Sequence, residues 1–187
     1  ITGEVNFLVN PGIYTEQILL NEIEGASEQQ TITFQSAGGN PEEVILQYAP
    51  QSPAMNYVLH LRGTDLITWK NMTIQNNNSQ DYGKVIVLSE GCNEVTISGN
   101  ILNGIGINFQ PTYDEIWDYA ILSSERGQDN LCNYVLIQNN VFNNGCIGIN
   151  LEGYDDQHLG KENRIIGNTF EGFYSVGIHL WYQKAPF

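Results

Sequence analysis

The feature that most constrains this chain is a short segment that recurs along most of its length. Each copy is a short apolar run that ends in Asn and is followed by further apolar residues. The copies are Ile67–Met72, Val95–Leu102, Val135–Phe142 and Arg164–Phe170. Their Asn residues are separated by 29, 40 and 28 positions. A period of this size indicates a repeat fold, in which each repeat is one structural unit stacked on the next.

A second apolar segment recurs in phase with the first. Its copies begin at Leu59, Ile86, Ile121, Ile149 and Ile178, so the two segments share nearly the same period. Both are short and are broken by Gly and Asn, which favours strands over helices. One repeating coil with three strands and three turns accounts for both segments. The sequence therefore predicts a single all-β domain over residues 1–187, a parallel solenoid of about six coils with three parallel sheets.

In such a stack, equivalent residues of successive coils lie about 4.8 Å apart. An inward Asn at a tight turn can then hydrogen-bond the turn backbone and the Asn of the next coil. We expect this ladder at one turn of the solenoid, formed by Asn71, Asn100, Asn140 and Asn168. The first coil fits less well, because its second segment begins closer to its Asn than in the other three coils.

Two of the three cysteines share one place in the repeat. Cys92 and Cys132 each lie eight positions before their ladder Asn, where Gly63 and Gly160 stand in the other coils. The place calls for small residues, and it puts the two sulfur atoms on adjacent coils. The Cα atoms of the two residues are then close enough for a disulfide. Parallel strands orient the Cα–Cβ bonds poorly for a bridge, however, so two packed free thiols are the alternative. With three cysteines, at least one thiol remains unpaired within the chain.

The charge balance excludes several classes of partner. Seven Lys and Arg against 21 Asp and Glu give a net charge of −14, which repels nucleic acid and anionic membranes. No apolar run has the length of a membrane span, so membrane insertion is also excluded. A polyuronate ligand would need screening by Ca²⁺ or a local basic strip. Neutral glycans carry no such penalty.

The opening segment Val5–Glu16 contains Pro-Gly-x-Tyr after a strand-like run. It resembles the first coil of many proteins of the pectate-lyase-like superfamily. The next strands of that pattern are Ile32–Ser36 and Val44–Leu46, joined by a turn at 38–41. The resemblance extends over nearly the whole chain and implies a right-handed parallel β-helix of the secreted or surface-displayed bacterial type. Lyases, hydrolases, esterases, tailspikes, adhesins and scaffolds share this fold, so the resemblance implies no single activity.

In the superfamily, the outer face of the first sheet carries the substrate groove, and the segments at Ile149 and Ile178 belong to this sheet. Two long turns, 110–118 and 153–158, are expected to wall the groove. Their rings would stack on pyranose faces while their acids accept hydrogen bonds from hydroxyls. The expected carbohydrate-binding residues are Tyr113, Trp117, Tyr154 and Trp181. In the alternative, these rings fold back onto their own domain and the acids are only solvated.

Catalytic and metal-binding residues have less support in the sequence. The carboxylates and the imidazole that suit glycan cleavage are Asp118, Glu152 and His179. The acids that suit a Ca²⁺ site are Asp114, Glu115, Asp155 and Asp156, although their spacing matches no dedicated calcium loop. The paired-Asp signature of polygalacturonases and the Arg and Ca²⁺ patterns of pectate lyases do not occur. We therefore expect no cofactor, with Ca²⁺ as the alternative.

These observations support a leading hypothesis and an alternative. The leading hypothesis is an extracellular or cell-surface solenoid module without catalysis of its own, serving as scaffold, adhesin or glycan-binding surface. The alternative is a segment of a polysaccharide lyase or glycoside hydrolase. The chain begins in a strand-like run and stops where a further coil is expected, as in a fragment of a longer solenoid or a subunit that stacks end to end. The expected partner is a polysaccharide or further copies of the chain.

Overall fold

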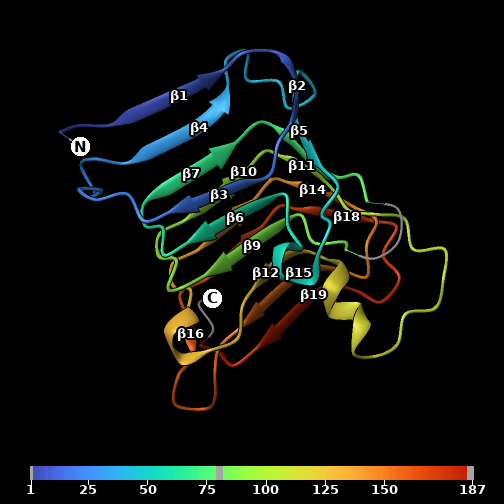
Figure 1. Cartoon of the computed structure of the whole chain (residues 1–187). Helices are drawn as coiled ribbons and strands as arrows, with labels where there is room; N and C mark the ends of the chain where they lie inside the picture. The colour runs from blue at the N-terminus through green and yellow to red at the C-terminus, as the bar shows by residue number, and fades with distance from the viewer. Residues whose placement is uncertain (1, 79–81, 185–187) are drawn as a thin grey trace.

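The computed structural model describes residues 2–78 and 82–184 and consists almost entirely of short parallel strands (Figure 1). They form three main sheets of six strands each. Sheet A contains β1 (Val5–Val9), β4 (Ile32–Ser36), β7 (Ile67–Lys70), β10 (Thr96–Ser98), β13 (Leu136–Gln138) and β17 (Arg164–Ile166). Sheet B contains β2 (Gly12–Thr15), β5 (Val44–Tyr48), β8 (Thr73–Asn76), β11 (Ile101–Asn103), β14 (Val141–Asn143) and β18 (Thr169–Glu171). Sheet C contains β3 (Ile18–Asn21), β6 (Leu59–Arg62), β9 (Ile86–Ser89), β12 (Ala120–Ser124), β15 (Ile147–Glu152) and β19 (Val176–Trp181).

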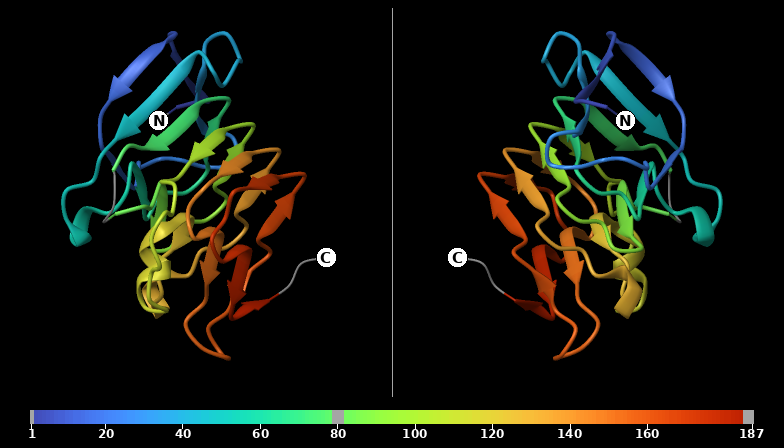
Figure 2. Two further views of the ribbon diagram at one scale, coloured as in Figure 1. Left: turned by 90° about the vertical axis from the view of Figure 1, so that its right-hand side faces the viewer. Right: turned by 90° about the vertical axis from the view of Figure 1, so that its left-hand side faces the viewer.

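Each coil gives one strand to sheet A, then one to sheet B and one to sheet C. The chain winds in a right-handed sense, and the coils step along one axis from the N-terminal to the C-terminal end (Figures 1 and 2). In sheet A, Thr68 pairs with Thr96, Thr96 with Leu136, and Leu136 with Arg164. This register confirms the predicted repeat, the six coils and the three parallel sheets.

The other elements are short insertions in the turns. A two-stranded sheet joins β16 (Gly160–Lys161) to β20 (Gln183–Lys184). The 3₁₀ helices are η1 (Pro53–Met55), η2 (Glu115–Tyr119) and η3 (Gln128–Asn130). Within the described residues, none of these helices has the length and apolar character of a membrane-spanning segment.

The core fills the inside of the coils, because alternate side chains of each strand point inward. Similar residues stack along the axis. Phe7 lies on Phe34 with ring centroids 4.7 Å apart, and Phe34 lies on Trp69 at 4.8 Å. Phe142 and Phe170 stack at 4.9 Å farther along. Burying such a side chain contributes about 1.5–3 kcal/mol, so contacts between successive coils stabilise the fold.

The predicted Asn ladder is confirmed for three of its four members. Oδ1 of Asn140 accepts the backbone N–H of Asn100 at 2.9 Å and its Nδ2 at 3.1 Å. Oδ1 of Asn168 accepts the same two groups of Asn140, at 2.9 and 3.0 Å. Each Nδ2 also donates to a carbonyl of the preceding coil, those of Trp69, Ile97 and Ile137. Asn100 and Asn140 are buried, so the ladder satisfies the turn backbone where water has little access.

The assignment of Asn71 to the ladder is wrong by one residue. Met72 is the equivalent of Asn100, and its backbone N–H donates to Asn100 Oδ1 at 3.0 Å. Asn71 instead has a φ of 55° and occupies the left-handed position of the turn, which Gly99 fills in the next coil with a φ of 64°. A Cβ at Gly99 would collide with Asn71 Oδ1. Asn and Gly tolerate this backbone conformation best, which explains why an Asn stands one position before the ladder.

Candidate functional site

The outer face of sheet C is where the sequence places the groove. In register along this face lie His60, Val87, Ser123, Asn150 and His179. Val87, Ser123 and Asn150 are buried, although they point away from the core. The hydroxyl of Ser123 is buried without a hydrogen-bond partner among the described residues. The middle of this face is therefore covered and does not form an open groove.

Two turn segments lie against this face. In Figure 1, η1 lies in front of β12 and β15, and η2 lies beside β19. The Tyr57 ring, next to η1, contacts the His60 imidazole with centroids 4.9 Å apart. Nδ2 of Asn56 donates to the backbone oxygen of Asp118 at 2.9 Å, which ties the two segments together. The segment expected to wall the groove, 110–118, is thus tied over the sheet by its end at Asp118, and the accessible part of the face is the one nearest the C-terminal coil.

An aromatic strip occupies that part of the face. We define it as Tyr113, Trp117, His179, Trp181 and Tyr182. Successive centroids lie 5.9 Å (Tyr113 to Trp117), 4.9 Å (Trp117 to His179), 6.1 Å (His179 to Trp181) and 5.5 Å (Trp181 to Tyr182) apart. Tyr113 is 73% exposed and Trp181 is 41% exposed, so these two rings are accessible to a ligand, whereas the other three are half-buried. The structure thus brings three of the four predicted aromatic residues into one continuous row.

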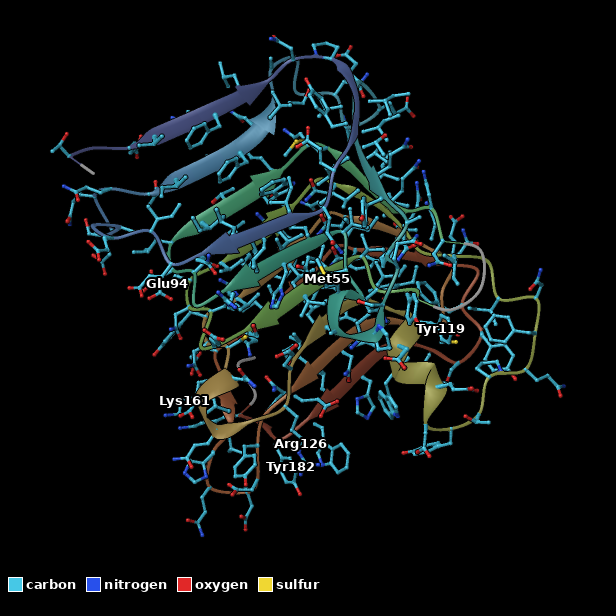
Figure 3. All side chains as sticks on the ribbon, in the orientation of Figure 1. Met55, Glu94, Tyr119, Arg126, Lys161 and Tyr182 are labelled. Carbon is cyan, nitrogen blue, oxygen red and sulfur yellow. The ribbon has the colours of Figure 1, made fainter. Side chains whose placement is uncertain are left out.

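Tyr154, the fourth predicted aromatic residue, is joined to the strip through Arg126. The Arg126 guanidinium lies 5.1 Å from the Trp181 ring and 5.8 Å from the Tyr182 ring. Nη2 of Arg126 donates to the Tyr154 backbone oxygen at 3.1 Å, while the Tyr154 ring contacts His158. Figure 3 shows Arg126 and Tyr182 next to each other at the C-terminal end of the molecule.

The sequence reading missed Arg126 and Tyr182 as members of this site. The signal was the repeat itself, because Arg126 and Tyr182 lie 56 positions, or two coils, apart and both align with Gly153 of the coil between them. Each stands just after a strand of sheet C, where the turns of successive coils stack. His179 was named only as a catalytic candidate, yet it is also the ring that joins Trp117 to Trp181.

Two of the three catalytic candidates belong to one hydrogen-bonded chain. Nδ1 of His179 lies 2.7 Å from Oδ1 of Asn150, and Nδ2 of Asn150 donates to Oε1 of Glu152 at 2.9 Å. Asn150 therefore joins His179 to Glu152 beside the strip. Asp118 is held instead through its backbone oxygen, which accepts hydrogen bonds from Asn56 and Gly83.

The four metal candidates lie in two separate loops. Oε2 of Glu115 accepts the backbone N–H and the hydroxyl of Thr112 at 2.7 and 2.9 Å, and these bonds lower the pKa of Glu115. Oδ1 of Asp155 is 2.7 Å from Nδ1 of His158, and this bond is the main cause that lowers the pKa of Asp155. Asp114 and Asp156 are exposed. No group of three or more His, Cys, Asp and Glu with metal-binding geometry occurs in the part of the chain that the structure describes, so the Ca²⁺ site remains a prediction.

His60 is the other polar group held on this face. Its Nε2 lies 2.7 Å from Oγ of Ser89, a buried hydroxyl on the next strand. Burial is the largest cause that lowers the pKa of His60, to about 4, and the positive charges of Arg62 and Lys84 act in the same direction. The imidazole is consequently neutral near pH 7, where it serves as a hydrogen-bond partner and carries no charge.

The cysteines stack as the repeat predicts, with a correction of one residue. A bridge between Asn93 and Asn133 places Cys92 and Cys132 on adjacent coils. The preceding coil contributes Thr64, whose hydroxyl lies 3.7 Å from the Cys92 sulfur, and Gly63 stands one position before it. The assignments of Asn71 and Gly63 are therefore both one residue too early, because the same register error in this coil affects both.

Both cysteines are free thiols in this structure, so the disulfide remains a prediction. The neighbouring Cys132 thiol is the largest cause that lowers the pKa of Cys92. The Cys92 thiol and burial in turn raise the pKa of Cys132. Burial raises the pKa of Cys146 to about 11.

Comparisons of the chain with protein-family models, with curated proteins and with solved structures give no match. The fold is a parallel β-solenoid, and its function has to be inferred from the chemistry of its surfaces.

Proposed function

We propose that this chain is a glycan-binding module of an extracellular or cell-surface protein, in which a parallel β-solenoid serves as the scaffold. The observation that carries this proposal is the aromatic strip, five rings in contact along one edge of the sheet C face. Accessible rings in a row suit a ligand with repeated flat apolar faces, and the faces of linked pyranoses have this character.

The polar groups around the strip support the same ligand class. Glu152, held by Asn150, supplies oxygen acceptors for hydroxyl groups, and the imidazole of His179 lies between two of the rings. Arg126 adds one cation beside Trp181. The net charge of −14 disfavours a highly anionic polymer, so the proposed ligand is a neutral glycan.

Titration calorimetry with soluble neutral polysaccharides, including xylan, mixed-linkage β-glucan and mannan, tests this proposal. Trp181→Ala and Trp117→Ala each remove one ring of the strip and should weaken binding on the order of 10-fold. Tyr134→Ala is the matched control, because Tyr134 is 55% exposed and lies in a turn before sheet A. Equal binding by all four proteins, or no binding to any neutral glycan, contradicts the proposal.

One observation favours the alternative of a glycan-cleaving segment. The Glu152 carboxylate is positioned by Asn150, which also contacts His179, so a carboxylate and an imidazole, two groups that can transfer protons, are linked at the strip. In that case the chain would release reducing ends from the polysaccharide it binds, and Glu152→Gln would abolish the release while binding is retained. Binding without release favours the module without catalysis.

A further inference from the structure

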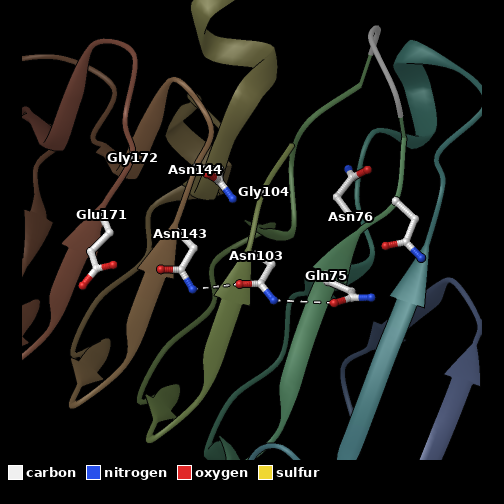
Figure 4. Close-up of a pocket in the computed structure, with 9 residues that line it drawn as sticks. Gln75, Asn76, Asn103, Gly104, Asn143, Asn144, Glu171 and Gly172 are labelled. Carbon is white, nitrogen blue, oxygen red and sulfur yellow. Dashed lines mark hydrogen bonds between the residues drawn. The ribbon is translucent and has the colours of Figure 1, made fainter. Parts of the chain in front are cut away.

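A second polar surface runs along the outer face of sheet B, away from the aromatic strip. Its side chains come from equivalent positions of successive strands: Thr15, Gln47, Gln75, Asn103, Asn143 and Glu171. The part from Gln75 to Glu171 lines a shallow groove of about 600 Å³ (Figure 4). We call this surface the amide groove. It contains no aromatic ring, and Glu171 is its one charged residue among the described residues that line it.

The amides of the groove are hydrogen-bonded in one direction. Nδ2 of Asn143 donates to Oδ1 of Asn103 at 2.9 Å, and Nδ2 of Asn103 donates to Oε1 of Gln75 at 3.5 Å (Figure 4). Nε2 of Gln75 donates to Oε1 of Gln47 at 2.9 Å, and Nε2 of Gln47 donates to Oγ1 of Thr15 at 3.1 Å. Every donor therefore points toward the N-terminal coil.

This arrangement leaves regular hydrogen-bonding capacity for a ligand. An amide has two N–H donors and two acceptor lone pairs, and the row uses one donor of each amide and one lone pair of each interior amide oxygen. Asn103 and Gln75 thus each present one free donor and one free acceptor. The presentation repeats at the strand spacing, about 4.8 Å. A pyranose in an extended β-linked chain has a similar length, so successive sugars can meet successive amides.

The direction of the row also makes its two ends different. Oδ1 of Asn143 is the acceptor end of the row, and its neighbour on the next strand is Glu171, a carboxylate. In the described part of the chain, neither oxygen group receives a side-chain donor, and no Lys or Arg forms an ion pair with Glu171. Aligned amide dipoles and a carboxylate place negative potential at one point of the groove, where a cationic donor is the matching group.

We propose that the amide groove binds an extended β-linked glycan that carries free amino groups, with one ammonium group between Asn143 Oδ1 and the Glu171 carboxylate. The interior amides contact the hydroxyl groups of neighbouring sugars. The net charge of −14 favours the same cationic ligand. This site goes beyond the proposed binding at the aromatic strip, because it lies on another sheet and depends on other residues.

The test is calorimetric titration of the purified chain with a β-1,4-glucosamine hexamer, its fully N-acetylated form and a β-1,4-glucose hexamer, at a mildly acidic pH that keeps the amines protonated. We expect the glucosamine hexamer to bind tightest. Glu171→Gln should weaken its binding on the order of 10-fold, because a charge-assisted hydrogen bond is lost. Glu162→Gln removes the same charge in a turn before sheet A and is the matched control.

The titrations are repeated in Trp181→Ala, in which binding at the aromatic strip is weakened, and there the preference for the glucosamine hexamer and its loss in Glu171→Gln should persist. Equal losses in Glu171→Gln and Glu162→Gln would show general electrostatic attraction and overturn the proposal. Equal affinity for the three hexamers would also overturn it, because no amino group would then be recognised. If Trp181→Ala alone abolishes binding, the ligand occupies the strip and the amide groove is not the site.

Discussion

Nδ2 of Asn140 lies 3.0 Å from Oδ1 of Asn168, the residue 28 positions later that fills the same place in the next coil. The contact shows that residues one period apart in the sequence are hydrogen-bonded neighbours in the stack of coils. Each ladder side chain bonds one backbone N–H and one backbone carbonyl of the preceding coil, and residues one period apart in the sequence therefore become neighbours along the axis.

Replacing Asn140 with Ala should destabilise the protein by roughly 2–4 kcal/mol, because several buried donors and acceptors lose their partners together. These are the backbone N–H of Asn100 and the carbonyl of Ile97, while Nδ2 of Asn100 and Oδ1 of Asn168 each lose one of two partners. The free energy of unfolding in urea measures the effect. Asn6→Ala, at an exposed position of β1, is the control and should change stability by less than about 0.5 kcal/mol. A loss at Asn140 no greater than at Asn6 would refute the ladder's contribution.

The corrected register makes a different prediction for Asn71. Its φ of 55° is favourable for Gly and unfavourable for residues with a Cβ. Asn71→Gly should therefore leave stability almost unchanged, whereas Asn71→Ala should cost about 1 kcal/mol. Urea unfolding of the two variants compares them directly. If Asn71→Gly were as damaging as Asn140→Ala, Asn71 would be a ladder residue after all.

The paired thiols predict an unusual thiolate. The neighbouring Cys132 thiol is the largest cause that lowers the pKa of Cys92. Ultraviolet absorbance during a pH titration should reveal one thiolate that forms below the ordinary range of a thiol. In Cys132→Ala this step should move to higher pH, since burial then dominates. Cys146→Ala is the control, because Cys146 lies outside the pair and has a pKa of about 11. A titration unaltered by Cys132→Ala would contradict the pairing.

The same pair tests the predicted disulfide. Treatment of the purified protein with a mild dithiol oxidant should give a crosslink between Cys92 and Cys132, which mass spectrometry of the digested protein identifies. Each thiol loses one hydrogen to the oxidant as the sulfur–sulfur bond forms. Recovery of three unmodified thiols would support the alternative of two packed thiols.

His60 predicts a loss of stability in acid. Its pKa is about 4 in the folded chain and about 6.5 when unfolded, so between these values the unfolded state binds more protons. The free energy of unfolding should therefore fall as the pH decreases from 6.5 toward 4, and the contribution of His60 is complete above pH 6.5. His60→Gln should make the dependence shallower. A His60 pKa near 6.5, measured by nuclear magnetic resonance, would exclude this effect.

The solenoid itself was predictable because stacking leaves a direct trace in the sequence. Equivalent residues of successive coils occupy the same environment, so Asn100, Asn140 and Asn168 recur at the intervals that the strand pairing confirms. The register failed at Asn71 for a local reason. A left-handed turn residue and an inward ladder residue can both be Asn, and only the hydrogen bond from Met72 to Asn100 distinguishes them.

The coil, the three parallel sheets and the neighbours of most side chains along the axis can be inferred from the repeat, because they follow from one period. The tertiary structure decided what covers the outer face of sheet C and which rings meet there. Contacts such as Tyr57 with His60 and Asn56 with Asp118 join segments whose separations do not follow the period. The packing of a loop depends on the whole surface on which the loop lies, so it cannot be predicted from the repeat alone.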